Sequence, residues 1–277
     1  MSRLFGRTAS LVVDTLDISL LDYTFRVKKS LKPEPNTMDL EVYNLNDDHR
    51  SQLEQSKAVV SRLEVGYGGN NSQIFLGEIR SCKTEIRGAD RVTKLSSGDK
   101  EKAIAKNRCK ATYSAQVSVD TALSNIAKVL GVQEGNLKQA VGRLQSRGIE
   151  NLFPRGIALY GKTWQVVQTI ARSANLEISI QDGALLILEF GAAIQGGSAI
   201  SLSSDPNNGL IGEPSEDADG TVTAECLIIP EIRPGVRVEL DSNTVSGDFR
   251  VWGCEYLGAT RGKDWNIKLT LKKIKAS

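Results

Sequence analysis

The chain has 277 residues, of which 35 are basic and 33 acidic, for a formal net charge of +2. This length allows one large domain or two modest ones, and the balanced charge excludes a global field that attracts nucleic acid. No apolar run approaches the about 20 residues of a membrane span, and residues 1–8 lack a secretory signal, so we expect assembly in a cytoplasm without membrane insertion.

Residues 1–100 are predicted to form a first antiparallel β-barrel module. Apolar and polar residues alternate along short segments, as in half-buried strands. The predicted strands cover residues 10–14, 24–28, 38–43, 62–67 and 74–79. Residues 68–71 (Gly-Gly-Asn-Asn) form a predicted turn, because Gly and Asn tolerate positive φ. A short helix is predicted after Asn46, which can cap it, with Leu53 and Lys57 on later turns.

Residues 101–195 are predicted to be an inserted α/β region. Apolar residues recur at steps of three and four over 119–130 and 163–174, which indicates two helices that each pack one face on a core. A hairpin is predicted from 176–180 to 185–188, because Asp182-Gly183 between apolar runs is a strong hairpin signal.

Residues 196–277 return to strand patterns and are predicted to form a second antiparallel β-barrel module. Its predicted strands are 221–229, 236–240, 249–256 and 265–271. Residues 213–220 are rich in acidic side chains and are predicted to form an exposed loop. The expected fold class is mainly β (α+β), with two tube-protein-like barrels and an inserted small α/β region.

One motif favours an enzyme. Residues 156–163 (Gly-Ile-Ala-Leu-Tyr-Gly-Lys-Thr) have the spacing of a phosphate-binding P-loop, with Gly156, Gly161, Lys162 and Thr163 as its key positions. The intervening residues are typical of a strand, and the residues after the second helix look antiparallel, whereas a nucleotide hydrolase needs further parallel units. We therefore interpret Thr163 as a helix N-cap.

Other catalytic and metal-binding constellations are sparse. The only histidine, His49, lies in a polar stretch that looks like a solvated helix turn, and no Cys-x-x-Cys pair occurs. The four cysteines are predicted to be buried thiols, and the three tryptophans are interpreted as core residues. We expect no metal, no cofactor and no enzymatic activity.

Several stretches in this order resemble the central baseplate hub proteins of contractile phage tails and related injection machines. They are Leu40–Arg50, Leu63–Gly69 with Gln73–Ile79, Lys162–Ile187, Gly220–Gly235, Gly247–Val251 and Asp264–Trp265. Each is a strand-and-turn pattern, and together they span most of the chain.

The resemblance implies a homotrimeric structural hub in the virion tail baseplate, assembled in the host cytoplasm. Such a hub joins the hexameric tail tube to the trimeric central spike and forms part of the channel through which DNA leaves; the tape measure protein is a further partner. Because Lys and Arg bind phosphates, Glu216, Asp217, Asp219 and Asp241 are expected to face the channel or its partners. The alternatives are a P-loop nucleotide-binding enzyme using Gly156–Thr163 and a different β-rich tail protein.

Overall fold

The computed structural model describes residues 4–55, 59–146, 152–205 and 208–275. The chain divides into two compact units. Unit 1 comprises Met1–Ser30, Asn36–Asp99 and Ala193–Ser277; unit 2 comprises Leu31–Pro35 and Lys100–Ala192. Unit 2 thus interrupts unit 1 in the sequence.

Unit 1 is built from strands and one helix. Its strands are β1 (Arg7–Val13), β2 (Leu16–Asp17), β3 (Tyr23–Ser30), β4 (Thr37–Tyr43), β5 (Val60–Tyr67), β6 (Asn70–Arg87), β7 (Asp90–Gly98), β14 (Ile200–Ser203), β15 (Leu210–Glu216), β16 (Thr221–Leu227), β17 (Arg237–Asp241), β18 (Ser246–Ala259) and β19 (Trp265–Lys273), and its helix is α1 (Asp47–Gln55). All thirteen strands belong to one hydrogen-bonded sheet.

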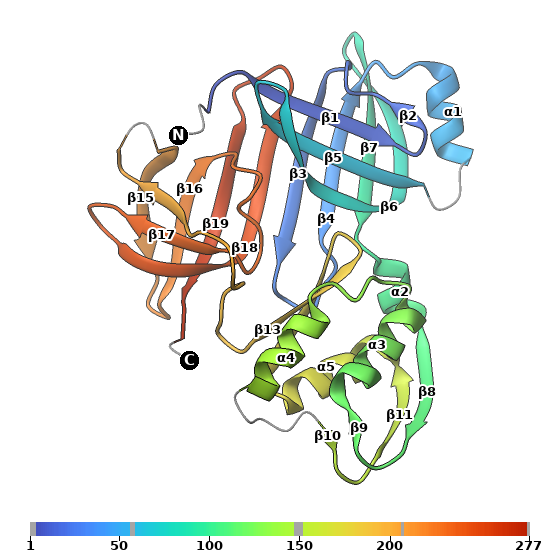
Figure 1. Cartoon of the computed structure of the whole chain (residues 1–277). Helices are drawn as coiled ribbons and strands as arrows, with labels where there is room; N and C mark the ends of the chain where they lie inside the picture. Colours follow the sequence, from blue (N-terminus) through green and yellow to red (C-terminus); the bar gives the residue numbers. More distant parts are fainter. Residues whose placement is uncertain (1–3, 56–58, 147–151, 206–207, 276–277) are drawn as a thin grey trace. The chain divides into compact units, whose positions relative to one another are not determined.

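Eight of these strands form one continuous antiparallel row. Its order is β15-β16-β19-β18-β3-β4-β7-β6. Figure 1 shows the blue β3 beside the orange β18, where segments from the two ends of the chain meet. Gly253–Ala259 of β18 pair there with Thr24–Ser30 of β3.

The row is a tandem repeat of one four-stranded arrangement. In β3-β4-β7-β6 two hairpins, β3–β4 and β6–β7, pair through their second strands. In β15-β16-β19-β18 the hairpins β15–β16 and β18–β19 pair in the same way. The long strands β6 and β18 also pair in their N-terminal parts with β5 and β17. We call these two sets of strands the first and second repeats.

A common hydrophobic core fills unit 1. Side chains from both repeats contribute, including the fully buried Phe75 and Tyr256. Phe25 packs edge-to-face on Trp265 with ring centroids 5.8 Å apart. Gly258, the partner of Phe25 across the β18–β3 junction, leaves the space that this ring occupies.

Unit 2 contains four helices and three two-stranded sheets within its described residues. Its elements are α2 (Glu101–Lys106), β8 (Arg108–Tyr113), β9 (Val117–Ser118), α3 (Val119–Leu130), α4 (Leu137–Ser146), β10 (Leu152–Phe153), β11 (Ile157–Lys162), α5 (Thr163–Ser173), β12 (Leu176–Gln181) and β13 (Ala184–Glu189). α3 begins where Ser118 Oγ accepts the Thr121 N–H and ends at Gly131, whose φ of 67° only glycine adopts readily. Side chains of α3, α4 and α5 share one core with the hairpin β12–β13.

The structure confirms the mainly antiparallel β class and the predictions of two helices, a hairpin and the helix after Asn46. α3 and α5 form where the apolar spacing predicts them, and the β12–β13 hairpin turns at Asp182 and Gly183, both with positive φ. The helix after Asn46 is α1, with the His49 N–H donating to Asn46 Oδ1 over 2.7 Å; Lys57 lies outside the described residues. The division into a first barrel at 1–100, an α/β insertion at 101–195 and a second barrel at 196–277 stays a prediction.

Two local predictions are wrong. Residues 213–216 belong to β15 instead of a loop. β15 pairs with β16 through Leu210 and Ile211 before an irregularity and through Ser215 and Glu216 after it. Thr163 is the first residue of α5 and does not cap it: Lys162 holds the capping position. The Thr163 hydroxyl is buried and has no hydrogen-bond partner among the described residues.

Candidate functional site

The outward face of the eight-stranded row carries charged side chains from seven of its strands. Along β3, β4, β16 and β19, buried residues alternate with half-buried or exposed ones, so that one face contacts the core and the other does not. The charged residues on this outward face are Arg26, Lys28, Asp39, Glu41, Lys83, Glu85, Arg87, Lys94, Glu225, Glu255, Lys268 and Lys272. We call it the mixed-charge face.

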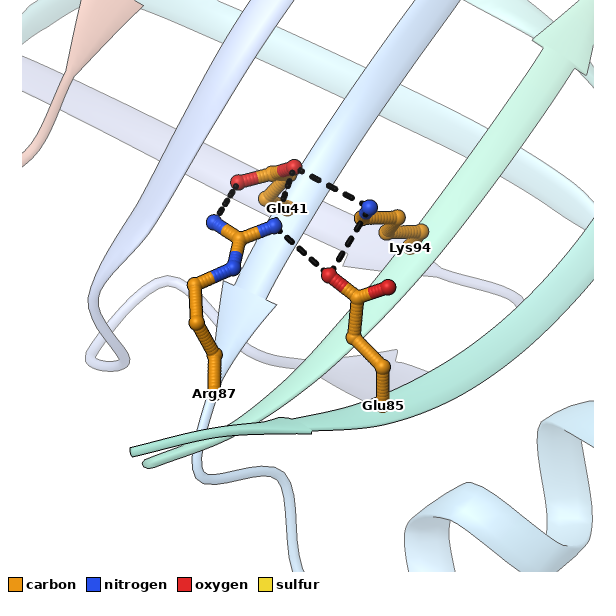
Figure 2. A network of polar contacts seen from close by, with 4 residues as sticks. All are labelled: Glu41, Glu85, Arg87 and Lys94. Carbon is orange, nitrogen blue, oxygen red and sulfur yellow. Dashed lines mark hydrogen bonds and ion pairs between the residues drawn. The ribbon is translucent and has the colours of Figure 1, made fainter. Parts of the chain in front are cut away.

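A four-residue ion network lies at the β4–β7–β6 end of this face. Figure 2 shows Arg87 and Lys94 each between the carboxylates of Glu41 and Glu85. The Arg87 guanidinium donates to both Glu41 oxygens, at 3.1 and 3.3 Å, and to Glu85 at 2.6 Å. Lys94 Nζ lies 2.8 Å from Glu85 Oε1 and 3.8 Å from Glu41 Oε1.

This network shifts the acidities of its members. Hydrogen bonds from Lys94 and then Arg87 lower the pKa of Glu85. Hydrogen bonds to Glu41 and then Glu85 raise the pKa of Arg87 further above its ordinary value. The side chains are 32 to 49% exposed, so each pair alone contributes little to stability. The network keeps its two cations occupied by carboxylates.

Carboxylates also accompany cations at the junction of the two repeats. Glu255 Oε1 on β18 lies 3.0 Å from Arg26 Nε and 3.6 Å from Lys28 Nζ on β3. Glu225 and Lys268 are direct cross-strand partners on β16 and β19, a position in which opposite charges attract. The sign of charge thus alternates across β16, β19, β18, β3 and β4, whereas Lys83 on β6 lies opposite Lys94 on β7.

Trp252 differs from the prediction that all three tryptophans are core residues. Trp164 and Trp265 are buried, but Trp252 is only half-buried. It is the unpaired residue of a β-bulge between Val251 and Gly253. The Lys272 ammonium lies 4.6 Å and the Arg250 guanidinium carbon 5.2 Å from the ring centroid, which are distances of cation–π attraction.

The row has an open edge at each end within the described part of the chain. As strands, β15 pairs only with β16, and β6 beyond Ile79 pairs only with β7. Side chains of the turn before β18 also contact β15: Thr244 Oγ1 donates to the Pro214 carbonyl over 2.7 Å, and Asn243 Nδ2 donates to Glu213 over 2.8 Å. The β6 end carries three basic residues, Arg80, Lys83 and Arg87, and one acidic residue, Glu85, whereas β15 carries the acidic Glu213 and Glu216. Unpaired edges are natural sites for pairing with another chain.

The four acidic residues expected at a channel lie off the mixed-charge face. Glu216, at the end of β15, is the cross-strand partner of the buried Val222 and so lies on the core-facing side of the sheet. The Lys273 ammonium lies 3.0 Å from Glu216 Oε1. Asp217 and Asp219 form the β15–β16 turn, where Asp219 accepts the Thr221 N–H, which lowers its pKa. Asp241 ends β17, and all four are exposed. The structure gathers Glu216, Asp217 and Asp219 at one turn and places Asp241 on another strand.

The P-loop spacing has the wrong geometry for a phosphate cradle. Ile157–Lys162 form strand β11, paired antiparallel with β8 from Ile157↔Tyr113 to Lys162↔Arg108. A P-loop instead turns as a loop, so that its N–H groups converge on phosphates at the helix start. Gly156 and Gly161 have positive φ, but an added Cβ at Gly156 would meet the Tyr113 carbonyl at 2.6 Å. The strand geometry of Ile157–Lys162 does not favour nucleotide binding at Gly156–Thr163.

Other candidate chemistry is also sparse in the described residues. They contain no group of three His, Cys, Asp or Glu that could hold a metal ion, and no helix among them is long and apolar enough to cross a membrane. Cys109, Cys226 and Cys254 are buried and Cys82 is half-buried. Burial raises the pKa of Cys226 to about 12, so this thiol is a core group.

The fold matches solved structures although no family model and no curated protein sequence matches the chain. A tail protein from Neisseria meningitidis MC58 superposes on this chain with a TM-score of 0.70 and 13% sequence identity. The 43 kDa tail protein of prophage MuSo2 from Shewanella oneidensis superposes with a TM-score of 0.70 and 8% identity. Each superposition covers 97% of this chain and 97% of the other protein. An Escherichia coli type VI secretion component, similar in structure to the T4 tail proteins gp27 and gp5, superposes with a TM-score of 0.56 and 9% identity. This superposition covers 96% of this chain and 75% of the Escherichia coli protein. The chain therefore has the fold of these phage tail and type VI secretion proteins.

Proposed function

We propose that the chain is a structural protein of a phage-type tail and serves there as the baseplate hub that joins the hexameric tail tube to the trimeric central spike. The observation that supports this proposal is the tandem repeat in one antiparallel row with an open edge at each end. The likeness in fold to phage tail proteins over 97% of both chains points the same way. The site of action is then the baseplate of the virion tail.

Two repeats per chain fit the change of symmetry at such a joint. A homotrimer has three-fold symmetry, but three chains with two similar repeats each present six similar units around the axis. One end of the ring can then match a hexameric tube ring, while the chains themselves match a trimeric spike. A protein with a single repeat would have to change symmetry elsewhere.

The in-chain junction provides the template for the junction between copies. Within the chain, the last strand of the second repeat, β18, pairs with the first strand of the first repeat, β3. Head-to-tail closure pairs the equivalent strands, β6 of one copy and β15 of the next. Because the row has eight antiparallel strands, its two end strands run in opposite directions, so this contact preserves the alternation. The basic β6 edge and the acidic β15 edge are complementary in charge.

The β15 edge also carries a restraint on pairing. It contains Pro214 and an irregularity between Ile211 and Ser215, both of which natural proteins use to prevent unspecific edge association. The ring is therefore expected to close mainly when the tube or spike protein presents the copies to one another.

In the assembled ring, the mixed-charge face lines the channel. Its cations sit beside carboxylates in the Glu41–Arg87 network and at Glu255, which weakens their hold on DNA phosphates as the strand passes. Glu216, Asp217, Asp219 and Asp241, which lie elsewhere, then meet partner proteins such as the spike, the tube or the tape measure protein. The protein acts through shape and pairing, without catalysis or a cofactor.

Light scattering on the purified chain, alone and mixed with the tube and spike proteins of the same particle, tests the proposal. The expected species has three times the 30.1 kDa mass of the chain. Lys83→Glu or Glu213→Lys alone should reduce the trimer, and the two changes together should restore it. Lys128→Glu, on the exposed surface of α3 in unit 2, is the matched control and should leave the trimer unchanged.

A chain that stays at 30.1 kDa under all these conditions would contradict the hub assignment. Trimers that are insensitive to both edge substitutions would contradict the β6–β15 contact. Binding of Mg-ATP that is lost in Lys162→Ala would contradict the non-enzymatic assignment.

A further inference from the structure

Unit 2 contains an apolar groove beside a free strand edge. The groove has a volume of about 520 Å³ and lies between β11 and α5, with Phe153, Ile157, Val166 and Ile170 among its lining residues. In the described part of the chain, β11 pairs with β8 alone. The edge of β11 that faces away from β8 is thus available to a further strand.

The backbone of β11 directs hydrogen-bonding groups to this free edge. The Thr163 N–H, one residue past the strand, donates to the Asn107 carbonyl on the β8 side over 3.0 Å. In an antiparallel pair, successive residues of a strand direct their N–H and C=O groups alternately toward the partner strand and away from it. Ala158 and Tyr160 therefore direct both groups away from β8. An added strand would find a regular set of donors and acceptors there.

The charge around the groove is basic. Unit 2 has 13 basic and 8 acidic residues, whereas unit 1 has 22 and 25. On the solvent face of the β8–β11 pair lie Arg108, Lys110 and Lys162, together with Tyr160, whose side chain is 76% exposed. Arg155 is exposed just before the strand. No acidic residue lies on β8 or β11 or lines the groove.

We propose that this groove binds an extended acidic segment of another protein, which adds as a strand to the free edge of β11. Main-chain hydrogen bonds to Ala158 and Tyr160 would give affinity, and alternate side chains would give specificity. One set of side chains is apolar and faces Val166 and Ile170 on α5. The other set is acidic and faces Lys162 and the basic side chains of β8.

A peptide-binding experiment on the full chain tests this proposal. The probe is a fluorescently labelled nine-residue peptide of alternating Val and Glu, measured by anisotropy at low salt. Of two matched control peptides, one has Lys in place of every Glu and the other has N-methyl groups on alternate backbone nitrogens. The first removes the charge complementarity and the second removes main-chain hydrogen bonds. We expect the acidic peptide to bind at least about tenfold more tightly than either control.

Matched variants locate the binding. Thr169→Trp fills the groove from an exposed position of α5, and Lys162→Glu reverses a charge at its edge. Each should weaken the acidic peptide about tenfold. Val129→Trp and Lys128→Glu make the same changes on the exposed face of α3 and should bind the peptide like the wild type. Absence of binding by the wild type, equal affinity for the lysine peptide, or unchanged affinity in Thr169→Trp would each overturn the proposal.

Discussion

Gly258 gives the sharpest test of how the two repeats are held together. It lies on β18 at the junction with β3, opposite Phe25. A Cβ added at residue 258 would lie 2.1, 2.5 and 2.8 Å from three atoms of the Phe25 ring. Ordinary van der Waals contact begins near 3.4 Å, so in Gly258→Ala the ring must move by more than 1 Å within a close-packed core.

The expected loss of stability follows from this displacement. Overpacking a core costs about 1–3 kcal/mol, and disturbing the edge-to-face contact of Phe25 with Trp265 adds about 0.5–1.5 kcal/mol. Replacing glycine by alanine in a strand returns about 0.5–1 kcal/mol. We therefore expect Gly258→Ala to lower the free energy of unfolding of unit 1 by about 2 kcal/mol, a large share of a typical 5–15 kcal/mol.

Urea unfolding followed by tryptophan fluorescence measures this effect, with Trp265 reporting on unit 1 beside the substituted position. Unit 2 can unfold separately, so the two transitions are fitted independently. Gly253→Ala on the same strand is the control, because its nearest contact would be an ordinary 3.4 Å to the Lys29 carbonyl. In a Phe25→Leu background, Gly258→Ala should cost at least about 1 kcal/mol less. Equal midpoints for Gly258→Ala and wild type, or strict additivity with Phe25→Leu, would refute the reasoning.

Three further predictions concern α1, a buried thiol and the ion network. Asn46→Ala removes the side chain that accepts the His49 N–H and should destabilise the protein by about 1 kcal/mol, whereas Asn46→Asp should retain most of the stability in the same urea experiment. Burial raises the pKa of Cys226 to about 12, so a thiol reagent at pH 8 should modify it, as mapped by mass spectrometry, only after unfolding; modification in the native protein would contradict its core position. Because the folded-state pKa of Glu85 is lowered below 4.5, its contribution to stability is present above that value and disappears as pH falls through the folded pKa. Titration by NMR should therefore show a depressed pKa for Glu85 that returns toward 4.5 in Arg87→Gln or in 1 M salt, and a salt-independent pKa would contradict the ion network.

Local features of the fold could be predicted because their causes are local. The apolar spacing of α3 and α5, the Asn46 cap and the Asp182-Gly183 turn each depend on a few neighbouring residues. The error at Thr163 has a local cause too: strand β11 continues through Lys162, which leaves Thr163 inside the first helical turn.

The candidate site could not be predicted in the same way, because it depends on pairing between distant segments. Nothing in residues 24–30 specifies residues 253–259 as their partners, and the mixed-charge face exists only once β18 pairs with β3. The alternating charges of β4 and β6 were visible in the sequence and could have indicated Glu41, Glu85 and Arg87 as sharing an outward face. Trp252 was misplaced because its bulge breaks the alternation on which the core assignment relied.

The covalent connection of the two repeats changes how the equilibrium amount of the proposed ring would depend on concentration. Six separate repeats would have to find one another, and the equilibrium amount of a closed ring would scale with the sixth power of their concentration. In this chain the β18–β3 junction is already intramolecular. Every second junction of the proposed ring is thus present before any two copies meet. Closure of three such chains depends on only the third power of concentration. The fused repeats would therefore let the proposed ring form at dilutions where single repeats would remain dispersed.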